Sequence, residues 1–403
     1  MCDPERSWSL SFSGCGFLFP YYLGAIDCMS ERAPHLLSGA RHFFGSSCGS
    51  IQSVFLLGGV PLNTLVKFSG GYFRRAMSHS MGVLHPSFNP SQILREQMER
   101  YLPANIHQLI SGRVFISLTR VSDWGNVLVS EFQTKDEVLD AMVCSCFIPI
   151  YCGLIPPSFR GVRYIDGAAS NNTPFFDAKT TVTMSPFYGE YDICPKVKST
   201  NFFHMEFSRS SFQFCSDNLH LLTHILFPKN VKDFTEHCIQ GYLDAARFLE
   251  ENGICNRPQP CLSSSSQEPD VPVPCCETMD LRASPGLAAW PVSPKKELLD
   301  HLCHGPLPLD KSILEKMSPR LILELNRTFK KENKFMSGIR NSLPAKVMSY
   351  VMLPCTLPVD YVIAMAWRLV KWLPHGHDDI QWLYSITFQI CSRVMTRLFP
   401  TYR

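Results

Sequence analysis

Short apolar stretches with strand character alternate with helix-forming stretches along the first 250 residues. Runs rich in apolar, β-branched and aromatic residues between turn residues are typical of strands, and they lie at residues 10–12, 42–44, 114–118, 127–132 and 180–184. Helical periodicity marks residues 92–101, 135–144 and 237–251. A capping box from Thr134 to Glu137 precedes the second of these helices. This interleaving predicts an α/β domain with helices layered on a sheet.

Charge and cysteine usage narrow the class of protein. Lys and Arg number 38 against 35 Asp and Glu, a formal net charge of +3, which is too balanced for a nucleic-acid binder. The 17 cysteines are scattered through apolar segments, and the polar, charged N-terminus is unlike a secretory leader. We therefore expect a protein that is not secreted, with free thiols in the cytosol and no nucleic-acid partner.

A nucleophile-elbow pattern, G-x-S-x-G, occupies residues 45–49, with Ser47 at its centre. A short strand precedes the pattern and apolar residues at helical spacing follow it, as a strand-to-helix turn requires. Such a turn places the serine hydroxyl at a helix N-terminus, where backbone N–H groups favour developing negative charge. Gly45 and Gly49 remove the Cβ atoms that would clash in so tight a turn. The alternative is an ordinary turn of small residues, because the pentapeptide also occurs by chance.

A second glycine-rich turn, Gly14-Cys15-Gly16, follows the first strand. Its backbone N–H groups could hold an oxyanion or a phosphate. A dinucleotide site uses the same spacing, but its third glycine is replaced here by Phe19, followed by Pro20, so the close helix–strand packing of that fingerprint is lost. The acidic residue expected roughly 20 residues further on is not clearly placed. We therefore predict no nucleotide cofactor.

An aspartate turn supplies the third part of a site. Asp166 follows the strand-like pair Tyr164-Ile165 and precedes Gly167. By itself this pattern is more typical of an Asx turn or a helix cap. Together, the glycine turn, the serine and the aspartate provide the oxyanion donors, nucleophile and base of an acyl-transfer site. Because the aspartate pKa is near ~3.9 in water, we expect an apolar cleft to raise it toward the working pH.

Histidine and metal chemistry are the alternatives. A Ser–Asp–His triad would use His204, downstream of Asp166, but residues 201–207 are typical of a half-buried strand, which favours a structural histidine. His85 fits a loop. The Cys and His pairs of the chain never combine into the two spaced ligand couples of a zinc site. We favour a serine–aspartate pair over the triad and predict no metal or other cofactor.

The three motifs resemble the signature blocks of patatin-like phospholipases, which place a Ser–Asp dyad on a three-layer α/β/α fold. The resemblance implies Ser47 as nucleophile and Asp166 as proton acceptor. It implies an oxyanion hole formed by the backbone of Gly14, Cys15 and Gly16. It also implies that Gly45, Gly49 and Gly167 are the glycines that support the turns of these motifs. The chain is similar to the animal triglyceride-lipase branch of the family at residues 116–123, 144–149 and 153–157. Residues 185–195 and 349–358 narrow the resemblance to one member of that branch.

Two departures from the family pattern follow the glycine turn. Phe19 stands where the family carries glycine, and Pro20 comes next. We expect a bulky side chain there to narrow the loop or shift it from oxyanion geometry, and loss of one oxyanion donor costs roughly 10²–10³ in turnover. Asn171, where relatives often carry aspartate, is a milder change. The pattern predicts an intact dyad with a lowered rate.

The composition changes after residue 257. Residues 258–294 are rich in Pro and Ser and are predicted to be a flexible linker. Residues 295–403 are apolar and basic, with interfacial Trp and Tyr, but their apolar runs fall short of the about 20 residues that span a bilayer. We expect this part to lie in a lipid surface; the alternative is a helical subdomain packed on the core. Residues 8–185 are then the catalytic domain and residues 186–257 its extension.

Three functions follow from these observations and the resemblance. The first is a serine acyl hydrolase of neutral glycerolipids, triacylglycerol above all, that works through an acyl-serine. The second is acyl transfer from acyl-CoA to lysophosphatidic acid. The third is a weakly active lipid-droplet protein that competes for the co-activator of a related lipase. This co-activator would have the α/β-hydrolase fold. In each case the expected location is the cytoplasmic face of lipid droplets and the endoplasmic reticulum membrane.

Overall fold

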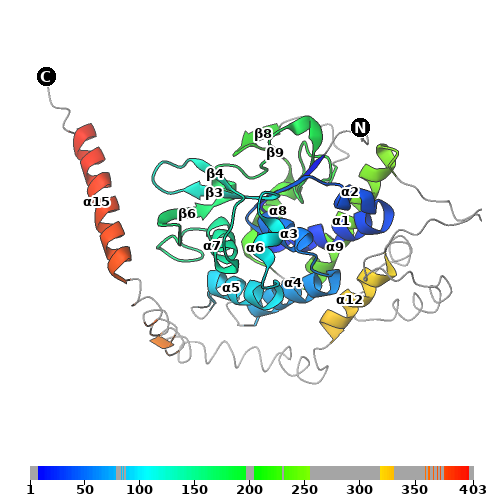
Figure 1. The fold of residues 1–403 in the computed structure, drawn as a ribbon, viewed down its shortest axis with the longest axis horizontal. Coiled ribbons are helices and arrows are strands. Elements are labelled where there is room, and N and C mark those ends of the chain that lie inside the picture. Colours follow the sequence, from blue (N-terminus) through cyan, green and yellow to red (C-terminus); the bar gives the residue numbers. More distant parts are fainter. Residues whose placement is uncertain are drawn as a thin grey trace, which may run out of the picture.

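The computed structural model describes residues 8–78, 88–196, 204–228, 231–254, 318–330 and 376–398, together with isolated positions between these ranges. Its centre is a seven-stranded mixed sheet in which neighbours pair in the order β5-β6-β3-β2-β1-β7, and β4 also pairs with β3. Helices flank the sheet (Figure 1). The predicted three-layer α/β/α fold is confirmed.

The five strands predicted at residues 10–12, 42–44, 114–118, 127–132 and 180–184 correspond to β1 (Ser9–Phe12), β2 (His42–Ser46), β3 (Val114–Arg120), β4 (Asn126–Val129) and β7 (Thr181–Met184). The sheet also contains β5 (Ser158–Phe159) and β6 (Val162–Asp166), and β8 (His204–Phe207) and β9 (Ser210–Gln213) form a separate hairpin. The strand predicted at residues 127–132 ends early. After Val129, the Ser130 carbonyl accepts from the Gly112 N–H, and the Phe132 N–H donates to Ser111 Oγ. These bonds draw the chain away from β3.

Strand register brings the carboxyl ends of β2 and β6 together on β3. β2 runs parallel to β3 with Ser46 opposite Ser117, and β6 runs antiparallel with Asp166 opposite Leu118. β4 pairs with residues 116–119 of β3, which overlap both sets of partners. A strand has only two edges, so β2 and β6 share the edge that β4 does not use. Their carboxyl ends therefore meet along that edge.

Eleven α-helices lie in the described part of the chain, and side-chain caps begin three of them, α5, α7 and α8. They are α1 (Pro20–Arg32), α2 (Pro34–Ser38), α3 (Cys48–Leu57), α4 (Leu62–Ala76), α5 (Pro90–Tyr101), α6 (Ile106–Ile110), α7 (Lys135–Ser145), α8 (Ser216–Leu226), α9 (Val231–Glu251), α12 (Pro319–Lys330) and α15 (Gly376–Leu398). The predicted helices match α5, α7 and the carboxyl-terminal part of α9. Thr134 Oγ1 accepts from the Glu137 N–H at 3.2 Å, so the predicted cap of α7 is present.

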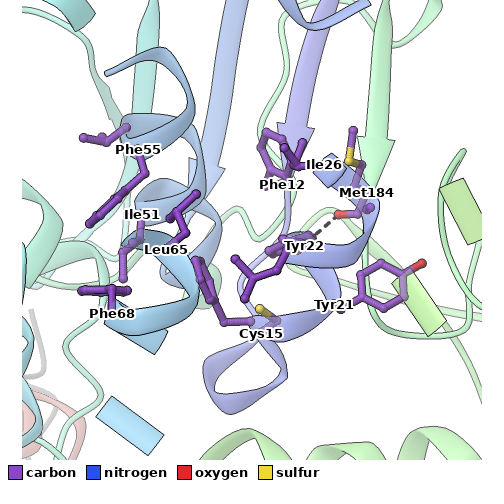
Figure 2. Close-up of a cluster of buried hydrophobic side chains, with 14 of the residues drawn as sticks. Phe12, Cys15, Tyr21, Tyr22, Ile26, Ile51, Phe55, Leu65, Phe68 and Met184 are labelled. Carbon is purple, nitrogen blue, oxygen red and sulfur yellow. Dashed lines mark hydrogen bonds between the residues drawn. The ribbon is translucent and has the colours of Figure 1, made fainter. Parts of the chain in front are cut away.

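The hydrophobic core joins the sheet to the helices. Figure 2 shows side chains of β1, β7, α1, α3 and α4 meeting in one cluster. Its labelled members on these elements include Phe12, Met184, Tyr22, Ile26, Ile51, Phe55, Leu65 and Phe68. The Tyr22 ring meets Phe12 edge-on, with ring centroids 5.3 Å apart. The cluster thus holds the carboxyl end of β1 against the helices that follow the two glycine-rich turns.

Two elements from residues 295–403 contact the domain. The side chains of Leu321, Ile322 and Leu325 on α12 are buried in the main core, and Arg74 of α4 donates to the Thr328 carbonyl at 2.9 Å. α12 therefore supports the alternative of helices packed on the core for this part of the tail. α15 begins beside β6, where Asp379 forms an ion pair with Arg163, and it extends away from the domain (Figure 1).

The other predictions for the second half of the chain lie outside the described residues. These are the linker at 258–294 and the greater part of the predicted lipid-surface region at 295–403, apart from α12 and α15. Within the described residues, no helix combines the length and apolar character needed to cross a membrane.

Truncating Leu321 to alanine should lower the free energy of unfolding by about 2–5 kcal/mol, because it opens a cavity in the main core. Urea unfolding of the full chain measures this change. The matched control is Leu383→Ala on α15, where the side chain is 41% exposed and a change within about 0.5 kcal/mol is expected. If Leu321→Ala lowered the free energy of unfolding as little as Leu383→Ala, α12 would not be part of the folding unit.

Candidate active site

The serine of the elbow lies in a strained turn between β2 and α3. Ser47 has φ 51° and ψ −127°, a conformation that costs a non-glycine residue about 1–3 kcal/mol. The turn is tight enough to exclude Cβ atoms on both sides. A Cβ on Gly45 would lie 2.3 Å from the Gly49 carbonyl oxygen, and one on Gly49 would lie 2.1 Å from the Phe12 carbonyl oxygen. The elbow predicted from residues 45–49 therefore has the expected geometry.

Ser145 holds the elbow in place, a role that sequence reasoning missed. The Ser47 N–H donates to Ser145 Oγ at 2.9 Å, and the Ser145 hydroxyl donates to the Ser117 carbonyl at 2.8 Å. Ser145 ends α7 in an apolar run that predicts only packing. Its one signal in the sequence is a hydroxyl between two cysteines of an apolar run, which is too common to identify a site.

Asp166 lies against Ser47. The Ser47 hydroxyl donates to Asp166 Oδ2 at 2.8 Å, and the Ala168 N–H donates to Oδ1 at 2.8 Å. The side chain of Thr119 fixes the backbone by donating to the Asp166 carbonyl at 2.8 Å. Gly167 is required here, since a Cβ would lie 2.0 Å from the Ser117 carbonyl oxygen. The two side chains are thus joined directly at the meeting point of β2 and β6.

Burial changes the pKa of the Asp166 carboxylate. It raises the pKa of Asp166 to about 6, although the hydrogen bonds from the Ala168 N–H and the Ser47 hydroxyl act in the opposite direction. Desolvation penalises the charged form of a carboxylate, whereas donors that point at it favour that form. A carboxylate with this pKa is a stronger base than one in water and is still ionised at neutral pH.

The glycine turn lies over the serine, but its first glycine is engaged. The Gly14 N–H donates to Asn172 Oδ1 at 2.8 Å, so this N–H is not free to hold an oxyanion. Among the described residues, no hydrogen bond uses the N–H of Cys15 or Gly16. The Tyr22 hydroxyl donates to the Ser13 carbonyl at 2.6 Å and fixes the start of the turn. Two of the three predicted donors are therefore available.

Phe19 does not narrow the turn. Its side chain points into the core, edge-on to Tyr22 and Phe68 with ring centroids 6.4 and 6.2 Å away. Pro20 begins α1, a position where proline's missing N–H is harmless. The expected distortion of the oxyanion loop is therefore not present. The Phe19 ring forms part of the wall of an apolar cavity beside the serine.

Two cavities meet at Ser47. The larger, of about 790 Å³, is lined by the glycine turn, Asp166 and apolar side chains of α8 and the β8–β9 hairpin. The smaller, of about 80 Å³, extends between α3, α4 and α5. They share the lining residues Gly16, Ser47, Ile148 and Ile225. An apolar molecule with an ester carbonyl at Ser47 would thus have apolar space in either cavity.

Histidine and metal alternatives receive no support from the described residues. In that part of the chain, neither Ser47 nor Asp166 has a hydrogen bond to a histidine. His204 begins β8, and its side chain lies outside the described atoms; His85 is buried in a loop. No group of three or more His, Cys, Asp or Glu side chains among the described residues is placed to hold a metal.

The fold and the geometry of Ser47, Asp166 and the glycine turn fit a serine acyl-transfer site, and comparison with known proteins assigns the family. The sequence profile described as "Patatin-like phospholipase" matches residues 10–179. Human (Homo sapiens) 1-acylglycerol-3-phosphate O-acyltransferase PNPLA3 is 56% identical over 406 residues, which cover 100% of this chain and 84% of that protein. The chain belongs to the patatin-like phospholipase family.

Further relatives place it within the family. The mouse (Mus musculus) 1-acylglycerol-3-phosphate O-acyltransferase Pnpla3 is 52% identical, with 100% of this chain and 93% of that protein covered. Human patatin-like phospholipase domain-containing protein 2 is 40% identical, with coverage of 98% and 75%. The member indicated by residues 185–195 and 349–358 is adiponutrin, that is PNPLA3, so this resemblance is confirmed. Family membership supports a lipid hydrolase or acyltransferase activity.

Replacing the buried carboxylate should change the pH dependence of stability. Because the pKa of Asp166 is about 6 in the folded protein and near 3.8 when unfolded, the folded state binds the proton more tightly. This stabilisation is present below pH 3.8 and is lost as pH rises through 6, a total of about 3 kcal/mol. Asp166→Asn removes the dependence, so its stability relative to the parent should rise between pH 4.5 and 7.5. Urea unfolding at both pH values measures the difference, and a constant difference would contradict the assignment.

Proposed function

We propose that this protein is a serine acyl hydrolase of neutral glycerolipids, with Ser47 as nucleophile and Asp166 as proton acceptor. The observation that carries the proposal is the 2.8 Å hydrogen bond from the Ser47 hydroxyl to Asp166, at the point where two apolar cavities meet. Serine is a weak nucleophile until an adjacent base takes its proton. The raised pKa of Asp166 supports that role.

The first half-reaction forms an acyl-serine. Ser47 Oγ attacks the ester carbonyl carbon while its proton passes to Asp166 Oδ2. The resulting oxyanion accepts hydrogen bonds from the N–H groups of Cys15 and Gly16, near the N-terminus of α3, where the helix dipole also favours negative charge. When the tetrahedral intermediate collapses, the ester C–O bond breaks, and the departing alcohol takes the proton from Asp166.

The second half-reaction restores the serine. A water molecule gives a proton to Asp166 as its oxygen attacks the acyl carbon, and the carboxylic acid leaves as Ser47 Oγ recovers that proton. Every proton passes through one carboxylate, so the cycle needs no histidine. The strained Ser47 conformation keeps the hydroxyl pointed at this carboxylate and at the cavities throughout.

The cavity walls favour a neutral lipid. Of the residues that line the larger cavity in the described part of the chain, Asp166 is the one with a charged side chain, and none is Lys or Arg. A phosphate group held inside would lack a cation to pair with. Triacylglycerol, the substrate implied by the resemblance to the triglyceride-lipase branch, has apolar arms and no charge.

A second candidate is acyl transfer to 1-acylglycerol-3-phosphate, which the printed names of the PNPLA3 relatives favour. The same acyl-serine would serve, with a lipid hydroxyl in place of water as the acceptor. The acceptor's phosphate would then have to lie outside the uncharged part of the larger cavity. Hydrolysis ranks first because it requires no charged subsite.

The proposed working place is the cytoplasmic face of lipid droplets and the endoplasmic reticulum membrane, where neutral glycerolipid collects. There the protein would contact the lipid surface and could also compete for an α/β-hydrolase-fold co-activator of a related lipase. The support for this location is the apolar, basic tail of the sequence. Competition for the co-activator without chemistry predicts effects on droplets that do not depend on Ser47.

Ser47→Ala should abolish ester turnover, with a loss of roughly 10⁴–10⁶. The assay compares triolein, phosphatidylcholine and 1-acylglycerol-3-phosphate with acyl-CoA, using purified full-length protein. The matched control is Ser46→Ala, because the neighbouring Ser46 hydroxyl is buried without a hydrogen-bond partner among the described residues. Fatty acid release from triolein by the control and none by Ser47→Ala is expected. Product from the phosphate acceptor alone would favour the transferase. Equal effects of both variants on lipid droplets in cells would favour competition for the co-activator.

The pH profile tests the base. Only the ionised form of Asp166 accepts the serine proton, and its pKa is about 6. The value of kcat/KM for a water-soluble ester should therefore rise about tenfold per pH unit below pH 6 and level off above it. A profile without an inflection between pH 5 and 7 would exclude Asp166 as the base.

A further inference from the structure

Exposed apolar side chains surround the opening of the larger cavity. On α8 and the hairpin beside it, Met205, Phe214, Leu219 and Leu222 line the cavity and are 52, 69, 68 and 47% exposed. The apolar part of the cavity wall thus continues outward onto the surface, next to the exposed polar residues Ser216 and Asp217 at the start of α8. Phe227, which follows Leu226 at the end of α8, is a further apolar side chain that is 43% exposed.

A short loop faces α8 at this opening and adds two more apolar side chains. Ile150 is 85% exposed and Leu154 80%, while their neighbour Pro149 lines the cavity. The loop is held firmly. The Ile150 N–H donates to the Gly153 carbonyl at 2.8 Å, and the Tyr151 hydroxyl donates to the Leu226 carbonyl of α8 at 3.1 Å. Its apolar side chains therefore point outward on an ordered backbone.

Ile150 is unfavourable for folding in two respects. Its φ of +72° lies in the left-handed region, where a β-branched residue is strained. Its side chain gains almost nothing from burial, since it is nearly all exposed. Glycine would adopt this backbone without strain. A residue that stabilises neither the loop nor the core is understandable if its side chain is buried against something outside the protein.

The opening limits what that occupant can be. A protein partner or a second copy of this chain, seated on the ring of apolar side chains, would close the entrance to the cavity that reaches Ser47. A lipid surface would cover the same side chains and leave the entrance open to its own molecules. Such a surface is also fluid enough to fit side chains that come from three separate segments.

We infer that the rim formed by Ile150, Leu154, Phe214, Leu219, Leu222 and Phe227 is a docking surface that inserts into the phospholipid layer covering neutral lipid. Docking there places the cavity mouth directly against the lipid. The inference rests on the proposed function in its choice of substrate, but it concerns the catalytic domain itself, independently of the tail. The substrate would then pass from lipid to Ser47 without crossing water.

The test measures binding apart from chemistry. Full-length protein carrying Ser47→Ala is mixed with phosphatidylcholine vesicles, and the bound fraction is measured by flotation. Ile150→Gly, Leu154→Ser and Phe227→Ser are then added singly and together; none of these side chains lines either cavity. Each single change should weaken binding by about tenfold. Leu109→Ser on α6 is the control, because this side chain is 41% exposed near the amino-terminal end of β3, at the opposite edge of the sheet from Ser47. It should leave binding unchanged.

Two further measurements separate the explanations. Ile150→Gly should keep or raise the melting temperature, since it relieves backbone strain. A lower melting temperature with unchanged vesicle binding would make Ile150 a structural residue and overturn the inference. Unchanged vesicle binding of the triple variant would also overturn it, and so would an equal loss of binding for Leu109→Ser. With Ser47 restored, the triple variant should hydrolyse a water-soluble ester at the parental rate. Absence of this turnover in the parent itself would refute the proposed function while the binding result stands.

Discussion

The hydrogen bond between Ser47 and Asp166 depends on the register of three strands. β4 takes one edge of β3, so β2 and β6 meet end to end on the other, and the serine after β2 faces the aspartate that ends β6. A shift of one residue in either ladder would turn these side chains to opposite faces of the sheet. The site is therefore a consequence of sheet topology. The core around β1 and α1 stabilises the sheet and so keeps Ser47 and Asp166 in contact.

Buried polar contacts complete the site by holding unfavourable conformations. The elbow conformation of Ser47 is strained, and the donor bond to Ser145 and the close approach of Gly45 and Gly49 keep it in place. Asp166 is kept ionisable by the Ala168 N–H in a cleft that otherwise favours its neutral form. Both residues cost stability, and the proposed chemistry explains why such a cost would be kept, since stability and activity are often traded at active sites.

Apolar surface connects this polar centre to the outside. The cavities that meet at Ser47 are walled by side chains from helices before and after the segments that carry Ser47 and Asp166, and apolar side chains of the larger cavity continue onto the exposed surface. Phe19 belongs to this apolar system. Its ring packs beside the smaller cavity, so its effect is expected on the shape of bound lipid, while the N–H groups of Cys15 and Gly16 stay accessible.

The sequence by itself determined the α/β class, the helices α5 and α7 with the latter's cap, the elbow around Ser47 and the candidate role of Asp166. These depend on periodicity, capping and turn chemistry, which act over a few residues. Only the tertiary structure showed that Ser145 supports the elbow, that Asn172 occupies the Gly14 N–H, and that α12 belongs to the core. Each of those contacts joins residues about 100 or more positions apart, and local patterns carry no information on which distant side chain closes a hydrogen bond or fills a gap.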